Sequence, residues 1–144
     1  MHSTEAKVII GLHRIVNDID RKTAALAAKH NLTFSQFAVL ECLYSKGDLT
    51  VGQVRESILS SVGTISIIVN NLVKMKYIER LGDEHDRRVC ILHLTPEGYD
   101  VISKLAPENA AMLRNELAIL SKSEKEEMVK LLKKLGGNEH GTES

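Results

Sequence analysis

Apolar residues recur at helical spacing over the first thirty positions of the chain. The members of this stripe are separated by three, four or seven residues: Val8, Leu12, Ile15, Ile19 and Leu26. Such spacing places them on one face of a single long helix. Asn31 is the predicted C-terminal cap of this helix, because asparagine tolerates the left-handed backbone conformation.

Three polar motifs predict where further helices begin. In each motif a Thr or Ser precedes a Gln or Glu by three residues, the pattern of a capping box. The three pairs are Thr33 with Gln36, Thr50 with Gln53, and Ser121 with Glu124. The first pair opens a helix to about Lys46, the second a short helix to about Ile58, and the third a final helix. That final helix carries one apolar face formed by Met128, Leu131, Leu132 and Leu135.

The centre of the chain has the pattern of a helix-turn-helix followed by a hairpin. A brief polar turn at residues 59–61 separates the short helix from a further helix predicted over Val62 to about Lys76. Two helices that meet across three or four residues are the mark of a helix-turn-helix. Residues 77–81 and 87–94 read as strands joined by a Gly- and Asp-rich turn. A hairpin in this position is a wing.

Helical structure resumes after the hairpin. Thr95 is the predicted N-cap, with Pro96 at the first helical position, and Pro107 is expected to kink or divide the helix. The fold class is therefore mostly α with a small β-hairpin wing. We divide the chain into an N-terminal helix (1–31), a winged helix-turn-helix (32–95), C-terminal helices (96–136) and a disordered polar tail (137–144).

This order of elements, with the residues that mark the ends of its helices and strands, resembles the MarR family of bacterial regulators. The resemblance covers residues 5 to 135 and is most specific in the wing, at Asp86-Arg87-Arg88, and in the string Leu94 to Gly98. It implies a homodimer formed by N- and C-terminal dimerisation helices, a pseudo-palindromic operator, and repression relieved by a small molecule or an oxidant. The sequence departs from the family in two places. Ser61 to Val73 carries no charged residue, and Tyr77 stands where the family often has Gly.

Composition limits how DNA binding can work. The chain has 144 residues, with 19 Lys plus Arg balanced by 19 Asp plus Glu. An indiscriminate polyanion binder would be strongly basic, so DNA binding must rest on local placement of charge. No apolar run reaches the roughly 20 residues that span a bilayer, and the polar N-terminus has no signal-peptide core. We expect a cytoplasmic protein without membrane contact.

The predicted recognition helix supplies most of the candidate DNA-binding residues, because the N-terminal part of such a helix enters the major groove. They are Ser61, Val62, Gly63, Thr64, Ser66, Ile67 and Asn70, with Lys74 near its end as a phosphate contact. Hydroxyls suit either kind of base edge, and Val62 and Ile67 suit thymine methyl groups. On a helix without such a context, these residues would be interpreted as an N-cap and a solvent-exposed face. The predicted wing that follows this helix favours DNA binding instead.

Two wing arginines complete the predicted site. Arg87 is expected in the minor groove, where narrow A·T-rich segments attract arginine. Arg88 is assigned either to a phosphate or to an ion pair with Asp83 or Asp86. Surface ion pairing is the alternative for both. Lys76 and Arg80 are secondary phosphate candidates.

An effector, if one is sensed, is expected between the dimer helices and the winged centre. His13, Phe37 and Tyr44 are candidate lining residues for a phenolic or other apolar ligand, against the alternative that each is ordinary core or surface. Cys90, two residues from Arg88, is a better redox candidate than Cys42, which follows Glu41. The cysteines and histidines lack metal-ligand spacing, so we expect no metal and no cofactor.

Two other function classes are alternatives to a DNA-binding regulator. An enzyme is disfavoured, because the chain contains no glycine-rich phosphate loop and no GxSxG motif. A winged-helix module that binds only protein stays open as the alternative function, given the zero net charge and the uncharged recognition segment. A monomer that folds its apolar stripes inward is the alternative to the dimer.

Overall fold

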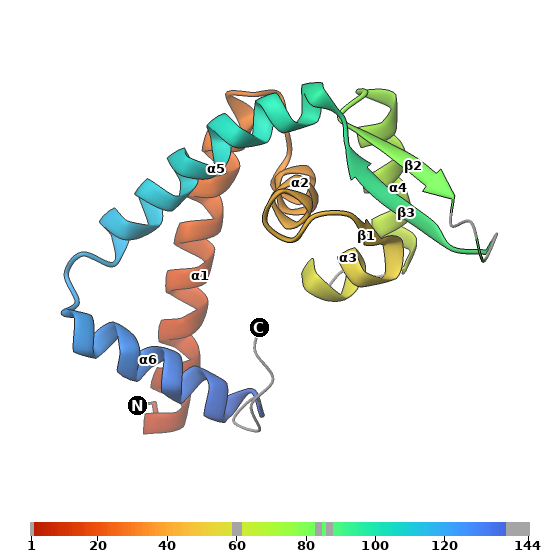
Figure 1. The fold of residues 1–144 in the computed structure, drawn as a ribbon. Helices are drawn as coiled ribbons and strands as arrows, with labels where there is room; N and C mark the ends of the chain where they lie inside the picture. Colours follow the sequence, from red (N-terminus) through yellow and green to blue (C-terminus); the bar gives the residue numbers. More distant parts are fainter. Residues whose placement is uncertain (1, 59–61, 83–84, 86–87, 138–144) are drawn as a thin grey trace. The chain divides into compact units, whose positions relative to one another are not determined.

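The computed structural model describes residues 2–58, 62–82, 85 and 88–137, with the side chains of residues 62 and 63 left aside. Its elements follow one another along the chain (Figure 1) as α1 (Thr4–Ala28), α2 (Phe34–Lys46), β1 (Leu49–Thr50), α3 (Val51–Ile58), α4 (Val62–Lys74), β2 (Ile78–Gly82), β3 (Cys90–Leu94), α5 (Pro96–Glu116) and α6 (Lys122–Leu135). Two compact units divide the chain, Met1–Ala110 and Ala111–Ser144. Within the described ranges, no helix is both long and apolar enough to cross a membrane.

All three predicted capping boxes form. The Thr33 N–H donates to Gln36 Oε1 at 3.0 Å and the Gln36 N–H donates to Thr33 Oγ1 at 3.1 Å. The same reciprocal pair joins Thr50 to Gln53 and Ser121 to Glu124. Each pair satisfies two N–H groups that have no partner inside a helix. The starts of α2, α3 and α6 are therefore fixed locally, as the sequence predicted.

Two helices of the first unit end in a residue of left-handed conformation. Asn31 has φ 60° and Lys76 has φ 66°. After α1, the Leu32 N–H donates to Ala27 O and the Asn31 N–H to Ala28 O, which is a Schellman motif. The role predicted for Asn31 is confirmed. After α4, the Tyr77 and Lys76 N–H groups make the equivalent bonds to Leu72 and Val73.

The turn after α4 corrects two expectations. Helix α4 ends at Lys74, two residues before the predicted end at about Lys76, because the Schellman bonds terminate the helix there. The position whose backbone favours glycine is Lys76, not Tyr77. Glycine is therefore favoured at Lys76 by its backbone conformation, whereas Tyr77 packs against the core.

The described residues form a three-stranded antiparallel sheet of order β1-β3-β2. The β2–β3 ladder runs from Ile78 opposite Leu94 to Gly82 opposite Cys90. The first wing strand thus starts one residue later than predicted, and the second starts at Cys90 rather than Arg87. Strand β1 was not predicted. Its two residues, Leu49 and Thr50, pair with Leu92 and Ile91, a ladder too short to leave an alternating pattern.

The core of the first unit gathers around α2. This helix packs against α1, α3, α4 and β3 (Figure 1). The largest side chains that are fully buried come from five elements: Leu40, Ile65, Leu72, Ile78, Leu92, Ile102 and Leu105. Because α4, the wing and the first part of α5 share this core, their positions relative to one another are fixed by close packing.

Helix α5 runs from Pro96 through Pro107 to Glu116 without interruption, so Pro107 does not divide it. The Gly98 N–H donates to Thr95 Oγ1 at 3.0 Å, which confirms Thr95 as the N-cap. Two side-chain contacts tie α1 to α5 within the first unit. Thr23 Oγ1 donates to Asn109 Oδ1 at 2.7 Å, and His30 Nε2 lies 3.2 Å from Glu108 Oε1.

Candidate nucleic-acid interface

Helix α4 has one buried and one exposed face. Ile65, Ile68, Val69 and Leu72 are at most 8% exposed. The side chains of Thr64, Ser66, Ile67 and Asn70 are exposed. Ile67 is 64% exposed, although an isoleucine gains free energy from burial. An exposed isoleucine flanked by hydroxyl and amide groups suits a surface that contacts both thymine methyls and polar base edges.

Asn70 on this face is held by a residue of the wing. The Arg80 guanidinium, on β2, donates through Nη2 to Asn70 Oδ1. Because a guanidinium only donates, the amide oxygen of Asn70 must face Arg80. Its NH₂ group is then directed away from Arg80, and no acceptor for it is found among the described residues. Arg80, expected as a phosphate contact, thus also orients a candidate base-reading side chain.

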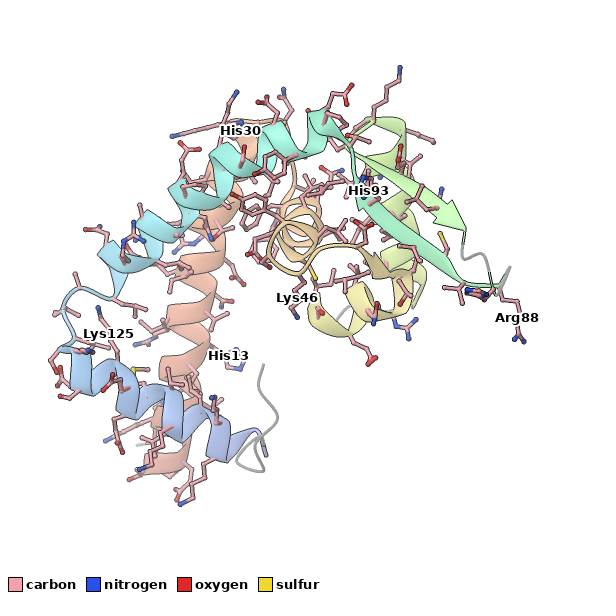
Figure 2. The ribbon with its side chains drawn as sticks, in the orientation of Figure 1. His13, His30, Lys46, Arg88, His93 and Lys125 are labelled. Carbon is pink, nitrogen blue, oxygen red and sulfur yellow. The ribbon has the colours of Figure 1, made fainter. Side chains whose placement is uncertain are left out.

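The wing carries Arg88 away from the paired part of the strands. Its side chain is exposed and extends from the tip of the hairpin (Figure 2). Arg87, Asp83 and Asp86 lie outside the described residues, so the roles predicted for Arg87 and for the Asp83 or Asp86 pair stay predictions. Ser61 also lies outside them. Val62 and Gly63 belong to the first turn of α4, and Lys74 is exposed in its last turn.

The three candidate effector-binding residues fall in three different places. His13 is exposed on α1 and lines a cavity of about 290 Å³ with Ile9, Leu12 and Val16. Phe37 is 6% exposed and belongs to the core, the alternative considered for it. Tyr44 lines a second cavity, of about 360 Å³, at the end of α2.

The two cysteines differ in burial. Cys42 is 4% exposed in the core, whereas Cys90 is half-buried at the start of β3. The more accessible thiol is therefore the one predicted as the redox candidate.

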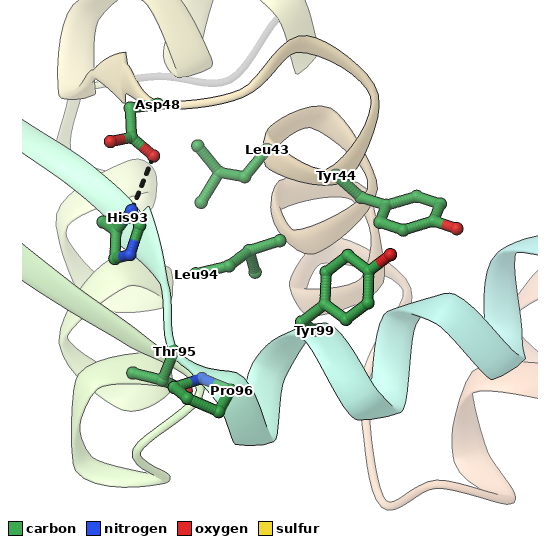
Figure 3. Close-up of a pocket in the computed structure, with 8 residues that line it drawn as sticks. All are labelled: Leu43, Tyr44, Asp48, His93, Leu94, Thr95, Pro96 and Tyr99. Atoms are coloured by element: carbon green, nitrogen blue, oxygen red, sulfur yellow. Dashed lines mark hydrogen bonds and ion pairs between the residues drawn. The ribbon is translucent and has the colours of Figure 1, made fainter.

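Sequence reasoning missed a cluster at the base of the wing. Leu43 and Tyr44 of α2, Asp48, His93 of β3 and Tyr99 of α5 line the same cavity (Figure 3). His93 Nδ1 lies 2.7 Å from Asp48 Oδ1. The signal that was available is a lone polar His93 between Leu92 and Leu94 in a strand of otherwise apolar residues.

Comparison with known proteins places the chain in a family. A MarR family model matches residues 30–89. The transcriptional regulator MhqR of Bacillus subtilis (strain 168) is 32% identical over 138 residues, which span 96% of this chain and 95% of that protein. The chain belongs to the MarR family.

MarR-family membership makes the chain a DNA-binding transcriptional regulator and not an enzyme. Two solved structures share the fold. The MepR–DNA complex of Staphylococcus aureus has a TM-score of 0.82 at 22% identity, covering 95% of this chain and 98% of that one. An organohalide-sensing regulator in its 2,4-dichlorophenol-bound form has a TM-score of 0.83 at 20% identity, covering 96% and 83%. The predicted winged helix-turn-helix is confirmed.

Proposed function

We propose that this MarR-family regulator is a repressor that binds a pseudo-palindromic operator as a homodimer and is released by a small molecule or an oxidant. The main support for the proposal is the exposed face of α4. On this face Ile67 lies outside the core, and so does the Asn70 side chain, which Arg80 orients. The N-terminal part of α4 enters the major groove. Lys74 and the backbone at the start of α4 bind phosphates, and Arg87 and Arg88 of the wing reach the adjacent minor groove or backbone.

Dimerisation rests on apolar faces that each unit exposes. On α1, Val8, Ile9, Ile15 and Val16 are each about half exposed. On α6, a second set is 40% to 69% exposed: Met128, Val129, Leu131, Leu132 and Leu135. Exposed apolar surface of this extent marks an interface. A two-fold dimer presents its two recognition helices about 34 Å apart, one turn of DNA.

Release by a small molecule is favoured by one relative of the same fold, which was solved with a chlorinated phenol bound. Release by an oxidant would use the half-buried thiol of Cys90. Either event acts on the winged centre, where a small shift changes the spacing of the two recognition helices.

Selection of bound sequences from random DNA tests the proposal. We expect one palindromic consensus, bound with an affinity that falls steeply as the salt concentration rises. Binding without sequence preference or salt dependence would favour the protein-interaction module instead.

A reciprocal pair of variants separates the dimer from the DNA contact. Ile15→Glu should halve the molar mass in light scattering and abolish operator binding, because a charge enters the proposed α1 interface. Ile67→Glu should leave the dimer at twice 16.0 kDa and abolish operator binding, because a carboxylate then faces DNA. An Ile67→Glu protein that binds the operator normally would remove the α4 face from the interface.

A further inference from the structure

The hydrogen bond between Asn70 of α4 and Arg80 of β2 fixes which way the Asn70 amide faces. Helix α4 packs against β2 (Figure 1), and Arg80 Nη2 donates to Asn70 Oδ1. A guanidinium has only donors, so an amide turned the other way would bring its NH₂ group against the N–H groups of Arg80. The oxygen of Asn70 is therefore the atom that Arg80 holds, and the NH₂ group points away from Arg80.

The pair presents donors to whatever approaches this face of α4. Both side chains are exposed. Within the described part of the chain, the bond between them is the one side-chain hydrogen bond or ion pair that either residue makes. The remaining N–H groups of Arg80 and the NH₂ group of Asn70 all donate. The positive charge of Arg80 beside the amide oxygen also polarises the amide and strengthens its NH₂ group as a donor.

A surface of donors selects among the edges of the four bases. A free asparagine reads adenine, because its oxygen accepts from N6 and its NH₂ group donates to N7. At Asn70 the adenine amino group would have to share the oxygen with a cation whose N–H groups repel it. Guanine presents two adjacent acceptors, O6 and N7, whereas thymine presents one and cytosine presents a donor. Guanine is the base whose edge matches the pair.

The position of Asn70 on α4 places this contact close to that of Ile67. Residues three apart on a helix are neighbours on one face, with Cβ atoms about 5–6 Å apart, and Ile67 is 64% exposed. Successive bases of one strand are separated by about 3.4 Å along the helix axis. The bases contacted by Ile67 and Asn70 are therefore about one or two steps apart.

We infer that Asn70, oriented by Arg80, selects a guanine in each half of the operator by donating its NH₂ group to the acceptors of the guanine edge. The inference rests on the proposed function, since it names the base that one part of the proposed interface reads. Arg80 is a positioning residue in this arrangement. Its removal should change which base is preferred, beyond any change in how tightly the operator is bound.

Selection from random DNA with the wild type, Asn70→Ala and Asn71→Ala locates the contact. One position of the wild-type consensus should lose its preference in Asn70→Ala, and we expect guanine there, favoured about tenfold over adenine. Asn71→Ala is the matched control, because it removes an amide from the next exposed residue of α4 and should keep that preference. Adenine at the Asn70-dependent position, or no position that depends on Asn70, would overturn the inference.

Asn70→Asp reverses the chemistry while keeping the shape of the side chain. One carboxylate oxygen still accepts from Arg80, and the other replaces the NH₂ donor by an acceptor. We expect the preferred base at that position to change from guanine to cytosine, which presents an amino group. Asn71→Asp adds the same charge to α4 and should keep guanine, even if the carboxylate weakens binding to every duplex. Guanine retained by Asn70→Asp would contradict a donor role for Asn70.

Variants of Arg80 test its positioning role by anisotropy with four duplexes that differ only at this base pair. Arg80→Ala frees the amide to turn, so the ratio of guanine to adenine affinity should fall to about one or below. Arg80→Lys keeps a cationic donor and should retain part of the ratio. A merely structural role would weaken all four duplexes alike, and an unchanged ratio in Arg80→Ala would overturn the inference.

The selection also separates failure of the inference from failure of the proposed function. A wild type that yields no consensus would overturn the proposed function, and the inference with it. A palindromic consensus in which no guanine depends on Asn70 would overturn the inference alone.

Discussion

The Cα of Gly98 lies directly against the backbone carbonyl of Tyr77. A Cβ at position 98 would overlap the Tyr77 oxygen and lie 2.8 Å from its carbonyl carbon. Thr95 adds to this junction, because its N–H donates to Tyr77 O at 3.1 Å and its Oγ1 donates to Lys76 O at 2.6 Å. The string from Leu94 to Gly98 therefore has a physical role. It locks the start of α5 to the turn that follows the recognition helix.

Gly98→Ala is predicted to destabilise the fold by about 3 kcal/mol, because neither backbone can yield without breaking the Thr95 bonds. Urea denaturation followed by circular dichroism measures the change. Gly52→Ala is the matched control. Its Cβ would meet only Thr50 Oγ1, at 3.9 Å, so alanine in helix α3 should be neutral or stabilise by up to about 1 kcal/mol. Equal stabilities for the two variants would contradict the close approach of Gly98 to the Tyr77 carbonyl.

Lys76→Gly is predicted to stabilise the fold by about 1 kcal/mol. Lys76 has φ 66°, a conformation in which an L side chain is strained and glycine is not. Asn31→Gly is the comparison, because Asn31 has φ 60° but asparagine tolerates that region, so the gain should be smaller. The urea denaturation midpoints of the two variants, each compared with the wild type, measure the two gains in stability. Destabilisation by Lys76→Gly would show that its side chain contributes more than the strain removes.

Local signals in the sequence were enough to predict most helix boundaries. Capping boxes, the Thr95 cap and Asn31 each act through bonds between residues a few positions apart, and such bonds can be recognised in the sequence. Strand β1 could not be predicted in this way, because Leu49 and Thr50 are a strand only through their pairing with Leu92 and Ile91. Lys76 was missed because a lysine carries no signal for a positive φ.

The same distinction applies to the site. The exposed face of α4 follows from helical periodicity, so Thr64, Ile67 and Asn70 could be named in advance. The contact between Asp48 and His93 joins residues 45 positions apart, and that between Asn70 and Arg80 joins a helix to a strand. Both depend on how the wing packs on the core, which no local pattern records.

Asn70 and Arg80 are predicted to act as one unit in operator binding. Asn70→Ala and Arg80→Ala should each weaken binding, and the double variant should lose little more than Asn70→Ala alone, because Arg80 acts by orienting the amide. Fluorescence anisotropy with labelled operator gives the four affinities. Losses that add in the double variant would assign Arg80 an independent contact. A salt slope reduced by about 1 in Arg80→Ala would identify that contact as a phosphate.

Arg87→Ala is predicted to weaken operator binding about tenfold or more while the dimer stays intact, because a wing arginine in the minor groove is attracted by its concentrated negative potential. Arg21→Ala removes the same charge from α1, where Arg21 pairs with Asp18 at 2.8 Å, and should leave operator affinity unchanged. Anisotropy and light scattering provide the two readouts. Unchanged affinity in Arg87→Ala would remove this residue from the DNA-binding site.

Cys90 is predicted to react with a thiol reagent such as dithionitrobenzoate at least about ten times faster than Cys42. Attack requires access to the sulfur, and Cys42 is 4% exposed whereas Cys90 is half-buried at the edge of the wing. The variants Cys42→Ser and Cys90→Ser assign the fast and slow phases. If oxidation regulates the protein, peroxide should weaken operator binding in Cys42→Ser and have no effect in Cys90→Ser. Equal loss in both variants would show that neither thiol alone controls DNA binding, and the proposal of release by an oxidant at Cys90 would then be wrong.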